Sequence, residues 1–460
     1  MPSTPPEASP PRRRDRRRKR RNMSCVAVTG TASCGKTMFL TSLLWHLEEF
    51  DESRFQLRDG ITLRRFRPLP LVKGQKPFQF KKYRSQIAHD FKWPSKTTDA
   101  SHFRCEFERS DWWSIWGTQK LDFMDLPGER VADAAIALHP DYVSWSDHFL
   151  DHLQRDTVGR DVLAEYRRAV GEEAVDARVA ARAYRVVLAR LIRAFKPFIS
   201  PSVFLVDSSG QCADNVSVDE LVEARRCGLD QEREFPPLPS EARLRLPELT
   251  AEFERHYREY RATVVLPLFR DLVRASTLLI LVDVPAMLLA GPRRFVDERQ
   301  VVLDLIDAVQ DEGFGARLLS LLGMGPALER VAFVATKADL VAVEDLRNGR
   351  LSGLVRSMNA RAAQLLPSSV AVKWFAASSL HSSSPGTKPY TLVGQTEPGP
   401  YVRERRAAEF SVSPLPEDWA ASWSKEDYRY PWFWPRVPEN LMVPPRHRSL
   451  DSLFDFIALG

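Results

Sequence analysis

Cysteine is scarce in this chain and scattered along it. No two cysteines form a C-x-x-C pair, and their number is odd: Cys25, Cys34, Cys105, Cys212 and Cys227. A disulfide framework is therefore not expected, and a reducing compartment is the default. The G-x-S-x-G pattern of many serine hydrolases is also missing, which removes one class of nucleophilic enzyme.

Long hydrophobic runs are missing as well. The most apolar stretch, Leu278 to Ala290, is interrupted by Asp283 and Pro285 and is too short to span a bilayer. The N-terminus has no apolar segment typical of a secretory signal. We therefore expect a cytoplasmic protein. Peripheral contact with a membrane surface remains an alternative.

Basic charge is concentrated at the N-terminus. Residues 1–22 hold nine basic and two acidic residues, a net charge of +7 in a chain whose total is +6. Such a segment has too few apolar residues to become ordered by burial, so we expect a disordered tail. Three interpretations of residues 12–21 stay open: a solvated tail, contact with an anionic membrane or nucleic acid, and a true start at Met23.

The remaining residues alternate between strand and helix patterns. Apolar strand patterns at 25–28, 277–284, 331–335 and 370–376 are separated by helical periodicity, which predicts an α/β fold with a parallel sheet. Residues 103–108 and 119–124 predict a hairpin. The expected parts are residues 23–135 and 275–380 for the sheet, a mainly helical insertion at 136–274, and a C-terminal extension at 381–460.

Two of these regions have no regular pattern. Residues 51–100 are mixed and polar, and we expect a long excursion there. Residues 385–445 hold eleven of the 33 prolines and four of the eleven tryptophans, so the extension is expected to be irregular and anchored by aromatic residues. A closing helix is predicted over residues 450–459.

The strongest motif satisfies G-x-x-x-x-G-K-[ST] between a predicted strand and a predicted helix: Gly30-Thr31-Ala32-Ser33-Cys34-Gly35-Lys36-Thr37, followed by Met38. Glycines let backbone N–H groups approach phosphate oxygens, and a helix N-terminus favours negative charge. Lys36 would contact the β- and γ-phosphates, and the Thr37 hydroxyl would bind Mg²⁺. The motif predicts a P-loop nucleotide site; the alternative is a glycine-rich turn that binds nothing.

A second motif follows the predicted hairpin. The strand Lys120–Met124 ends in Asp125-Leu126-Pro127-Gly128, a D-x-x-G pattern. Asp125 would hold Mg²⁺ through water, and the Gly128 N–H would sense the γ-phosphate. The alternative is a common turn.

A third motif points to the nucleotide base. An apolar strand is followed by Thr336-Lys337-Ala338-Asp339. The Asp339 carboxylate can accept hydrogen bonds from guanine N1–H and N2–H₂, which adenine does not offer, while the Lys337 stem would cover the base. Ala377 and Ser378 end the last strand and are predicted to contact the base oxygen. The alternative is a structural Asp339 that caps a helix.

Together these segments resemble the YcjX-like family of Ras-like, stress-induced P-loop GTPases. The likeness covers roughly residues 23–460 and is carried by Trp93-Pro94-Ser95-Lys96-Thr97-Thr98-Asp99, Leu121–Glu129, Tyr142-Val143-Ser144-Trp145-Ser146, Leu281–Val284, Phe333–Asp339 and Arg448–Asp451. It implies a Ras-like GTPase sheet formed by residues 23–135 and 275–380, a large helical insertion, GTP or GDP with Mg²⁺ as cofactors, and a stress-related switch acting on an unknown protein effector.

The resemblance also assigns roles and shows departures. Thr97 would complete the Mg²⁺ shell as the switch threonine. Many family members have arginine at the position of Ser33, and Ras-like enzymes often have glutamine where Glu129 stands. A carboxylate repels the γ-phosphate, so GTP hydrolysis is expected to be slow. An adaptor without useful turnover and an ATPase remain alternatives.

Two weaker patterns are interpreted as structural rather than functional. His148 and His152 are four residues apart, as in helical zinc sites, but no third ligand is evident, so a surface pair is the preferred interpretation. Trp112, Trp113 and Trp116 are interpreted as hydrophobic anchors, with base stacking as the alternative.

Overall fold

The fold is known from a computed structural model. It describes residues 23–31, 33–94, 100–110, 116–131, 133–155, 157–172, 175–195, 217–223, 233–310, 328–397, 407–436 and 443–459.

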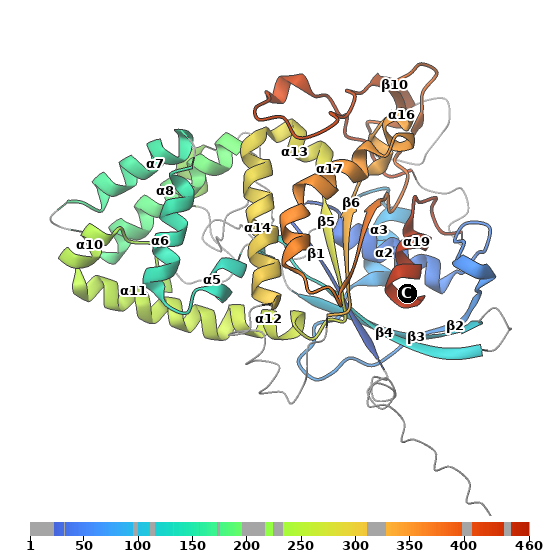
Figure 1. Cartoon of the computed structure of the whole chain (residues 1–460), viewed down its shortest axis with the longest axis horizontal. Coiled ribbons are helices and arrows are strands. Elements are labelled where there is room, and N and C mark those ends of the chain that lie inside the picture. The colour runs from blue at the N-terminus through green and yellow to red at the C-terminus, as the bar shows by residue number, and fades with distance from the viewer. Residues whose placement is uncertain are drawn as a thin grey trace, which may run out of the picture.

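A seven-stranded, mostly parallel sheet forms the centre of the fold (Figure 1). Its spatial order is β2-β3-β4-β1-β5-β6-β7, and the strands are β1 (Ser24–Gly30), β2 (Leu63–Pro68), β3 (Ser101–Ser110), β4 (Trp116–Asp125), β5 (Thr277–Val282), β6 (Arg330–Ala335) and β7 (Ala371–Ala376). The pairs involving β1, β5, β6 and β7 are parallel, whereas β2 and β4 both pair antiparallel with β3. The predicted α/β sheet and its β3–β4 hairpin are confirmed.

The continuous apolar runs of the central strands exist because both faces of the sheet are covered. Val28 and Leu279 pack on one side with α2 (Lys36–Glu48) and α19 (Leu450–Phe454). Their neighbours in sequence point to the opposite core, against the helices α13 (Val284–Ala290), α14 (Pro292–Gln310), α16 (Val343–Arg347), α17 (Arg350–Met358) and α18 (Ala360–Leu365). The two-residue period of a strand divides its side chains between these two cores.

A group of helices stands beside the sheet, at the left of Figure 1, with α14 between them and the strands. Its elements are α5 (Ala134–Leu138), α6 (Tyr142–Leu153), α7 (Thr157–Ala169), α8 (Ala177–Phe195), α9 (Val218–Glu223), α10 (Ser240–Arg245), α11 (Pro247–Tyr260), a π turn (Arg261–Val265) and α12 (Leu266–Leu272). The short helix α4 (Gly128–Val131) contacts β1 instead. Buried aromatic rings of Tyr142, Trp145, Phe235 and Tyr257 pack against one another at the centre of this group.

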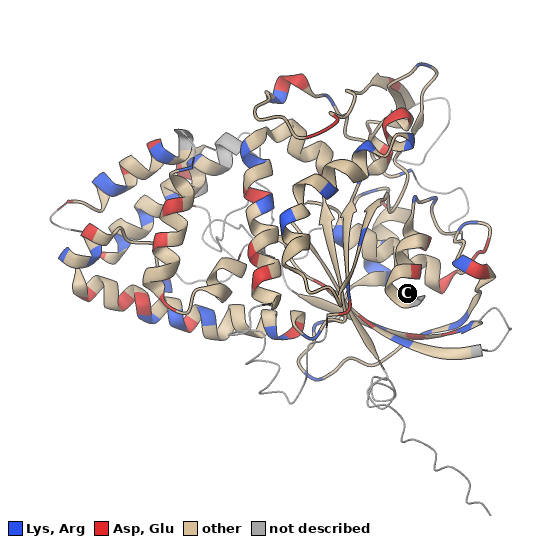
Figure 2. Cartoon of the chain, in the orientation of Figure 1, with Lys and Arg blue, Asp and Glu red and all other residues tan. Residues whose placement is uncertain are grey.

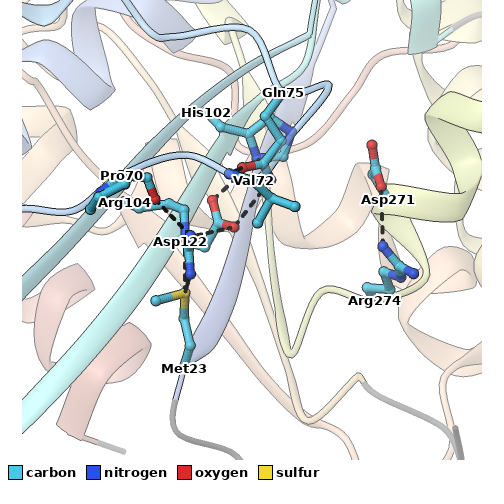
Figure 3. A network of polar contacts seen from close by, with 9 residues as sticks. All are labelled: Met23, Pro70, Val72, Gln75, His102, Arg104, Asp122, Asp271 and Arg274. Atoms are coloured by element: carbon cyan, nitrogen blue, oxygen red, sulfur yellow. Dashed lines mark hydrogen bonds and ion pairs between the residues drawn. The ribbon is translucent and has the colours of Figure 1, made fainter.

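A polar cluster joins β3 to β4 beside the start of β1 (Figure 3). Asp122 of β4 lies 3.1 Å from His102 Nδ1 and 3.8 Å from Arg104 Nε, both on β3. Gln75 donates to His102 at 3.0 Å, and Arg104 donates to the Met23 sulfur at 3.2 Å. Met23 therefore lies at the amino end of β1, at the end of the strand opposite to Gly30.

Regular structure also occurs in the two regions where the sequence predicts none. Residues 51–100 contain a 3₁₀ turn (Arg58–Gly60), the edge strand β2 and the helix α3 (Phe80–Ala88). The extension contains a small antiparallel sheet, β10-β9-β8, and a 3₁₀ turn (Lys425–Asp427); its strands are β8 (Ser383–Pro385), β9 (Thr391–Gln395) and β10 (Ala407–Ser411). The prediction of an irregular extension was therefore wrong in part, because short polar strands have no long apolar alternation to reveal them.

Figure 2 marks where the charged residues lie along the ribbon. Figure 2 shows both signs interspersed along the helices beside the sheet, while the central strands are largely uncharged. Among the described residues, no helix combines the length and the apolar character needed to cross a membrane.

The closing helix belongs to the core. Phe454 of α19 is fully buried, with ring centroids 5.8 Å from Phe55 and 5.6 Å from Phe107. A five-residue π turn (Asp455–Leu459) follows it.

We predict that Phe454→Ala lowers the free energy of unfolding by about 3–5 kcal/mol, because it leaves a cavity between elements distant in sequence. Guanidinium unfolding measures this change. The matched control is Trp432→Ala, whose ring is 54% exposed and whose loss should cost under about 1 kcal/mol. Equal, small effects of the two substitutions would show that α19 is not part of the core.

Candidate functional site

The loop between β1 and α2 has a backbone that only certain residues permit. Gly30 has φ 138°, and a Cβ there would lie 2.3 Å from the Leu281 carbonyl oxygen. Gly35 is the N-cap of α2 with φ 93°, and no side chain caps the helix. A helix N-terminus without a side-chain cap carries partial positive charge, which favours an anion.

Lys36, the first residue of α2, folds back over this loop. Its Nζ donates to the carbonyl oxygens of Gly30 at 2.9 Å and Thr31 at 2.8 Å, and the residue is only 8% exposed. Ser33 is exposed, whereas the Cys34 side chain is buried, and burial raises the pKa of its thiol. Met38 packs into the core, and Ala32 lies outside the described residues. The Lys36 ammonium and the N-terminus of α2 therefore lie together at this loop, and both favour the negative charge of phosphate oxygens.

The end of β4 brings a carboxylate to the same place. Asp125 pairs in register with Val28 of β1 and is fully buried. Thr37 donates its hydroxyl hydrogen to Asp125 Oδ2 at 3.2 Å. A hydroxyl and a carboxylate are hard oxygen ligands, so these two residues fit Mg²⁺ with the rest of the shell supplied by water and phosphate.

Of the other residues predicted near the end of β4, the structure describes Gly128 but not Thr97 or the Glu129 side chain. Gly128 is buried and opens α4 directly after Leu126 and Pro127. The Glu129 side chain and all of Thr97 lie outside the described residues, so their predicted roles stay predictions.

The loop after β6 brings the third motif to the same edge of the sheet. Thr336 donates its N–H to the Val282 carbonyl at 2.8 Å, and Lys337 adopts a left-handed backbone with φ 56°. Asp339 lies in a 3₁₀ turn (Ala338–Leu340), and its Oδ2 accepts from both the N–H (2.8 Å) and the hydroxyl (2.5 Å) of Ser382. Burial raises the pKa of Asp339, while the Ser382 hydrogen bonds act in the opposite direction.

Ser382 is a residue that sequence reasoning missed. The predicted contacts, Ala377 and Ser378, are buried next to this loop, and the Ala377 carbonyl accepts from the Ala338 N–H at 3.1 Å. Ser378 pairs through its backbone with Arg448. The side chain that fixes Asp339 lies four residues further along, and the run of serines after β7 gives no means to choose among them.

A buried ion pair on α14 was also missed. Arg294 Nε lies 2.5 Å from Glu298 Oε1, and the two side chains are 2% and 1% exposed. Burial raises the pKa of Glu298, while Arg294 and the adjacent Thr31 hydroxyl lower it. Arginine and glutamate four residues apart usually lie on a solvated helix face, so only tertiary structure reveals that this pair lies behind the loop of Lys36.

The histidine pair on α6 contacts acidic residues of α14. His152 Nε2 lies 2.8 Å from Asp297 Oδ1 and 2.9 Å from Arg293 Nη2, and no group of three or more His, Cys, Asp or Glu residues suited to a metal occurs in the described part of the chain. His148 lies 3.9 Å from Asp304, whose pKa is raised to about 6 by burial. These contacts join α6 to α14, so the prediction of a surface pair was wrong about their exposure.

The family comparison agrees with the sequence motifs. The model described as YcjX-like family, DUF463, matches residues 25–459, which is nearly the whole chain. No curated protein matches the chain. The likeness drawn from the motifs is therefore confirmed at the level of the family.

Proposed function

This chain belongs to the YcjX-like family, and we propose that it is a guanine-nucleotide-binding P-loop protein with slow, Mg²⁺-dependent GTP hydrolysis that acts as a stress-related molecular switch. One observation carries the proposal. Lys36, Asp125 and Asp339 come from three distant parts of the sequence, and each follows or ends a strand of the same sheet at its carboxyl edge.

The topology supports a ligand at this edge. β1 has parallel neighbours on both sides, β4 and β5, so the chain leaves β1 toward one neighbour and later returns to the other. In open α/β sheets, ligands bind outside the carboxyl ends of the strands at such a reversal of strand order. The glycine-rich loop with Lys36 lies at this reversal.

The three loops divide the work of binding. The N–H groups of α2 and the Lys36 ammonium would hold the phosphates, and Thr37 with Asp125 would hold Mg²⁺, which offsets phosphate charge during transfer. Asp339, fixed through Oδ2 by Ser382, would accept from guanine N1–H and N2–H₂. The ATPase alternative would leave the Asp339 arrangement without a ligand.

Equilibrium binding of GDP, GTP and ATP with Mg²⁺ tests the proposal directly. Tight binding of both guanine nucleotides and weak binding of ATP are expected. Single-turnover assays then separate a slow GTPase from an adaptor without turnover, and faster hydrolysis of ATP than of GTP would contradict the proposal.

We predict that Lys36→Ala abolishes tight GDP binding, because it removes charge-assisted contacts to the phosphates. Calorimetric titration with GDP measures the loss. The thermal midpoint of the variant, which should stay close to that of the wild type, is the control for folding. GDP affinity like that of the wild type would overturn the P-loop assignment.

We predict that Asp339→Asn weakens GDP binding by about 2–4 kcal/mol, because guanine donors are left imperfectly paired, and leaves ADP binding unchanged or relatively improved. Ser382→Ala should shift the same selectivity less, since it loosens the carboxylate without removing it. Competition titrations with GDP and ADP measure both variants. Equal losses for the two nucleotides would show that Asp339 has a structural role.

We predict that deletion of residues 1–22 leaves GDP affinity and the thermal midpoint unchanged. Met23 lies at the amino end of β1, roughly 20 Å from Gly30 at about 3.3 Å per residue. Any binding of the full chain to anionic vesicles or nucleic acid should fall on deletion and weaken with salt. Vesicle co-sedimentation and nucleic-acid titration measure this; reduced GDP affinity of the shortened chain would place the tail at the site.

A further inference from the structure

Lys337 has a backbone conformation that costs energy. Its φ of 56° and ψ of 37° lie in the left-handed region, which non-glycine residues seldom adopt. Strained backbone of this kind persists only when the surroundings enforce it, and it is common at ligand sites. Here the N–H groups of Thr336 and Ala338, on either side of Lys337, donate to Val282 and Ala377.

The Lys337 side chain is directed inward by an ion pair. Its Nζ lies 2.5 Å from Asp283 Oδ2, and Asp283 is 2% exposed while the Lys337 side chain is 34% exposed. Burial alone would lower the pKa of Lys337, but the charge of Asp283 and its hydrogen bond outweigh burial and raise it. Because the ammonium is held inward, the methylene stem is the part of this side chain left to contact a ligand.

Asp283 is itself held in place by two partners. It follows β5, and its Oδ1 accepts from the Ala286 N–H at 3.1 Å as the N-cap of α13. One carboxylate oxygen therefore serves the helix and the other serves Lys337. The capping function needs only an acceptor oxygen, which asparagine also provides, whereas the attraction to Lys337 needs the charge.

The surroundings of this pair make its charge balance important. The buried Arg294–Glu298 pair interacts electrostatically with the Lys337–Asp283 pair. The charge of Arg294 acts to lower the pKa of Lys337, and the charge of Asp283 acts to raise the pKa of Glu298. Two carboxylates thus offset two cations in this region. Removal of one partner of a buried pair leaves an uncompensated charge, while removal of both is often nearly neutral.

We propose that Asp283 is a positioning residue for the base site: through its ion pair with Lys337 it holds the lysine stem against the face of the purine bound by Asp339. The inference rests on the proposed guanine-nucleotide function and adds to it a residue outside the three motifs. Without the charge of Asp283, the Lys337 side chain regains rotamers that binding must order again.

The test is a double-variant cycle on the full chain with Asp283→Asn, Lys337→Met and the two combined, measured by GDP titration with Mg²⁺. Asparagine keeps the cap of α13, and methionine keeps an unbranched stem without charge. Asp283→Asn is expected to weaken GDP binding about tenfold, which corresponds to about 1.4 kcal/mol. The combined variant should bind GDP more tightly than either single variant, because both buried charges are then gone.

A second cycle on a remote ion pair provides the control. Arg185 and Glu234 form a buried pair in the helical group, with Nη2 and Oε1 2.5 Å apart. Arg185→Met and Glu234→Gln should lower the thermal midpoint without changing GDP affinity.

The remaining outcomes overturn the inference in distinguishable ways. Unchanged GDP affinity in Asp283→Asn would show that Asp283 serves only as the N-cap of α13. Additive losses in the combined variant, or recovery of the thermal midpoint without recovery of GDP affinity, would show that it does not act on the ligand through Lys337. Tighter GDP binding in Asp283→Asn would mean that its charge only repels phosphate. Wild-type chain that binds no GDP would instead refute the proposed function, and this inference with it.

Discussion

The parallel pairing of β1 with β4 and β5 is the constraint on which the candidate site depends. Hydrogen bonds set Val28 beside Asp125 on one side and Gly30 beside Leu281 on the other. The carboxyl ends of the three strands therefore lie close together at one edge of the sheet, and the loops that follow them are neighbours. A Cβ at position 30 would clash with the Leu281 carbonyl oxygen. The close approach of β5 to β1 therefore requires glycine at this position.

Paired charges are buried on one side of the sheet, along the helix α14. The helix α14 carries two neighbouring i, i+4 ion pairs, Arg293–Asp297 and Arg294–Glu298, each almost excluded from solvent. The first contacts His152 of α6, and the second lies behind Thr31. Desolvated charges are costly unless they are paired, so adjacent faces of one helix tie the helical group and the glycine-rich loop to fixed positions.

The C-terminal extension packs against the central sheet and the elements around it. The Trp93 indole donates to the Phe433 carbonyl at 3.1 Å, and the backbone of Arg448 pairs with Ser378 after β7. His46 of α2 contacts the Pro445 carbonyl at 3.0 Å, and burial lowers the pKa of this imidazole to about 3, so it is neutral near pH 7. The extension thus contacts α2, the loop after β7 and Trp93.

The sequence by itself predicted the central residues 25–28 of β1, the hairpin, the strands β5 to β7 and the glycine-rich loop, because apolar periodicity and glycine placement are local properties. It also singled out Lys36, Thr37, Asp125 and Asp339 as candidate site residues, because their residue types and order can be read along the chain. Only the tertiary structure decided the edge strand β2, the small sheet of the extension, and the partners Ser382, Asp283 and Arg294. The physical reason is that a serine or an i, i+4 ion pair looks the same in sequence whether it is solvated or buried, and only long-range packing removes the water.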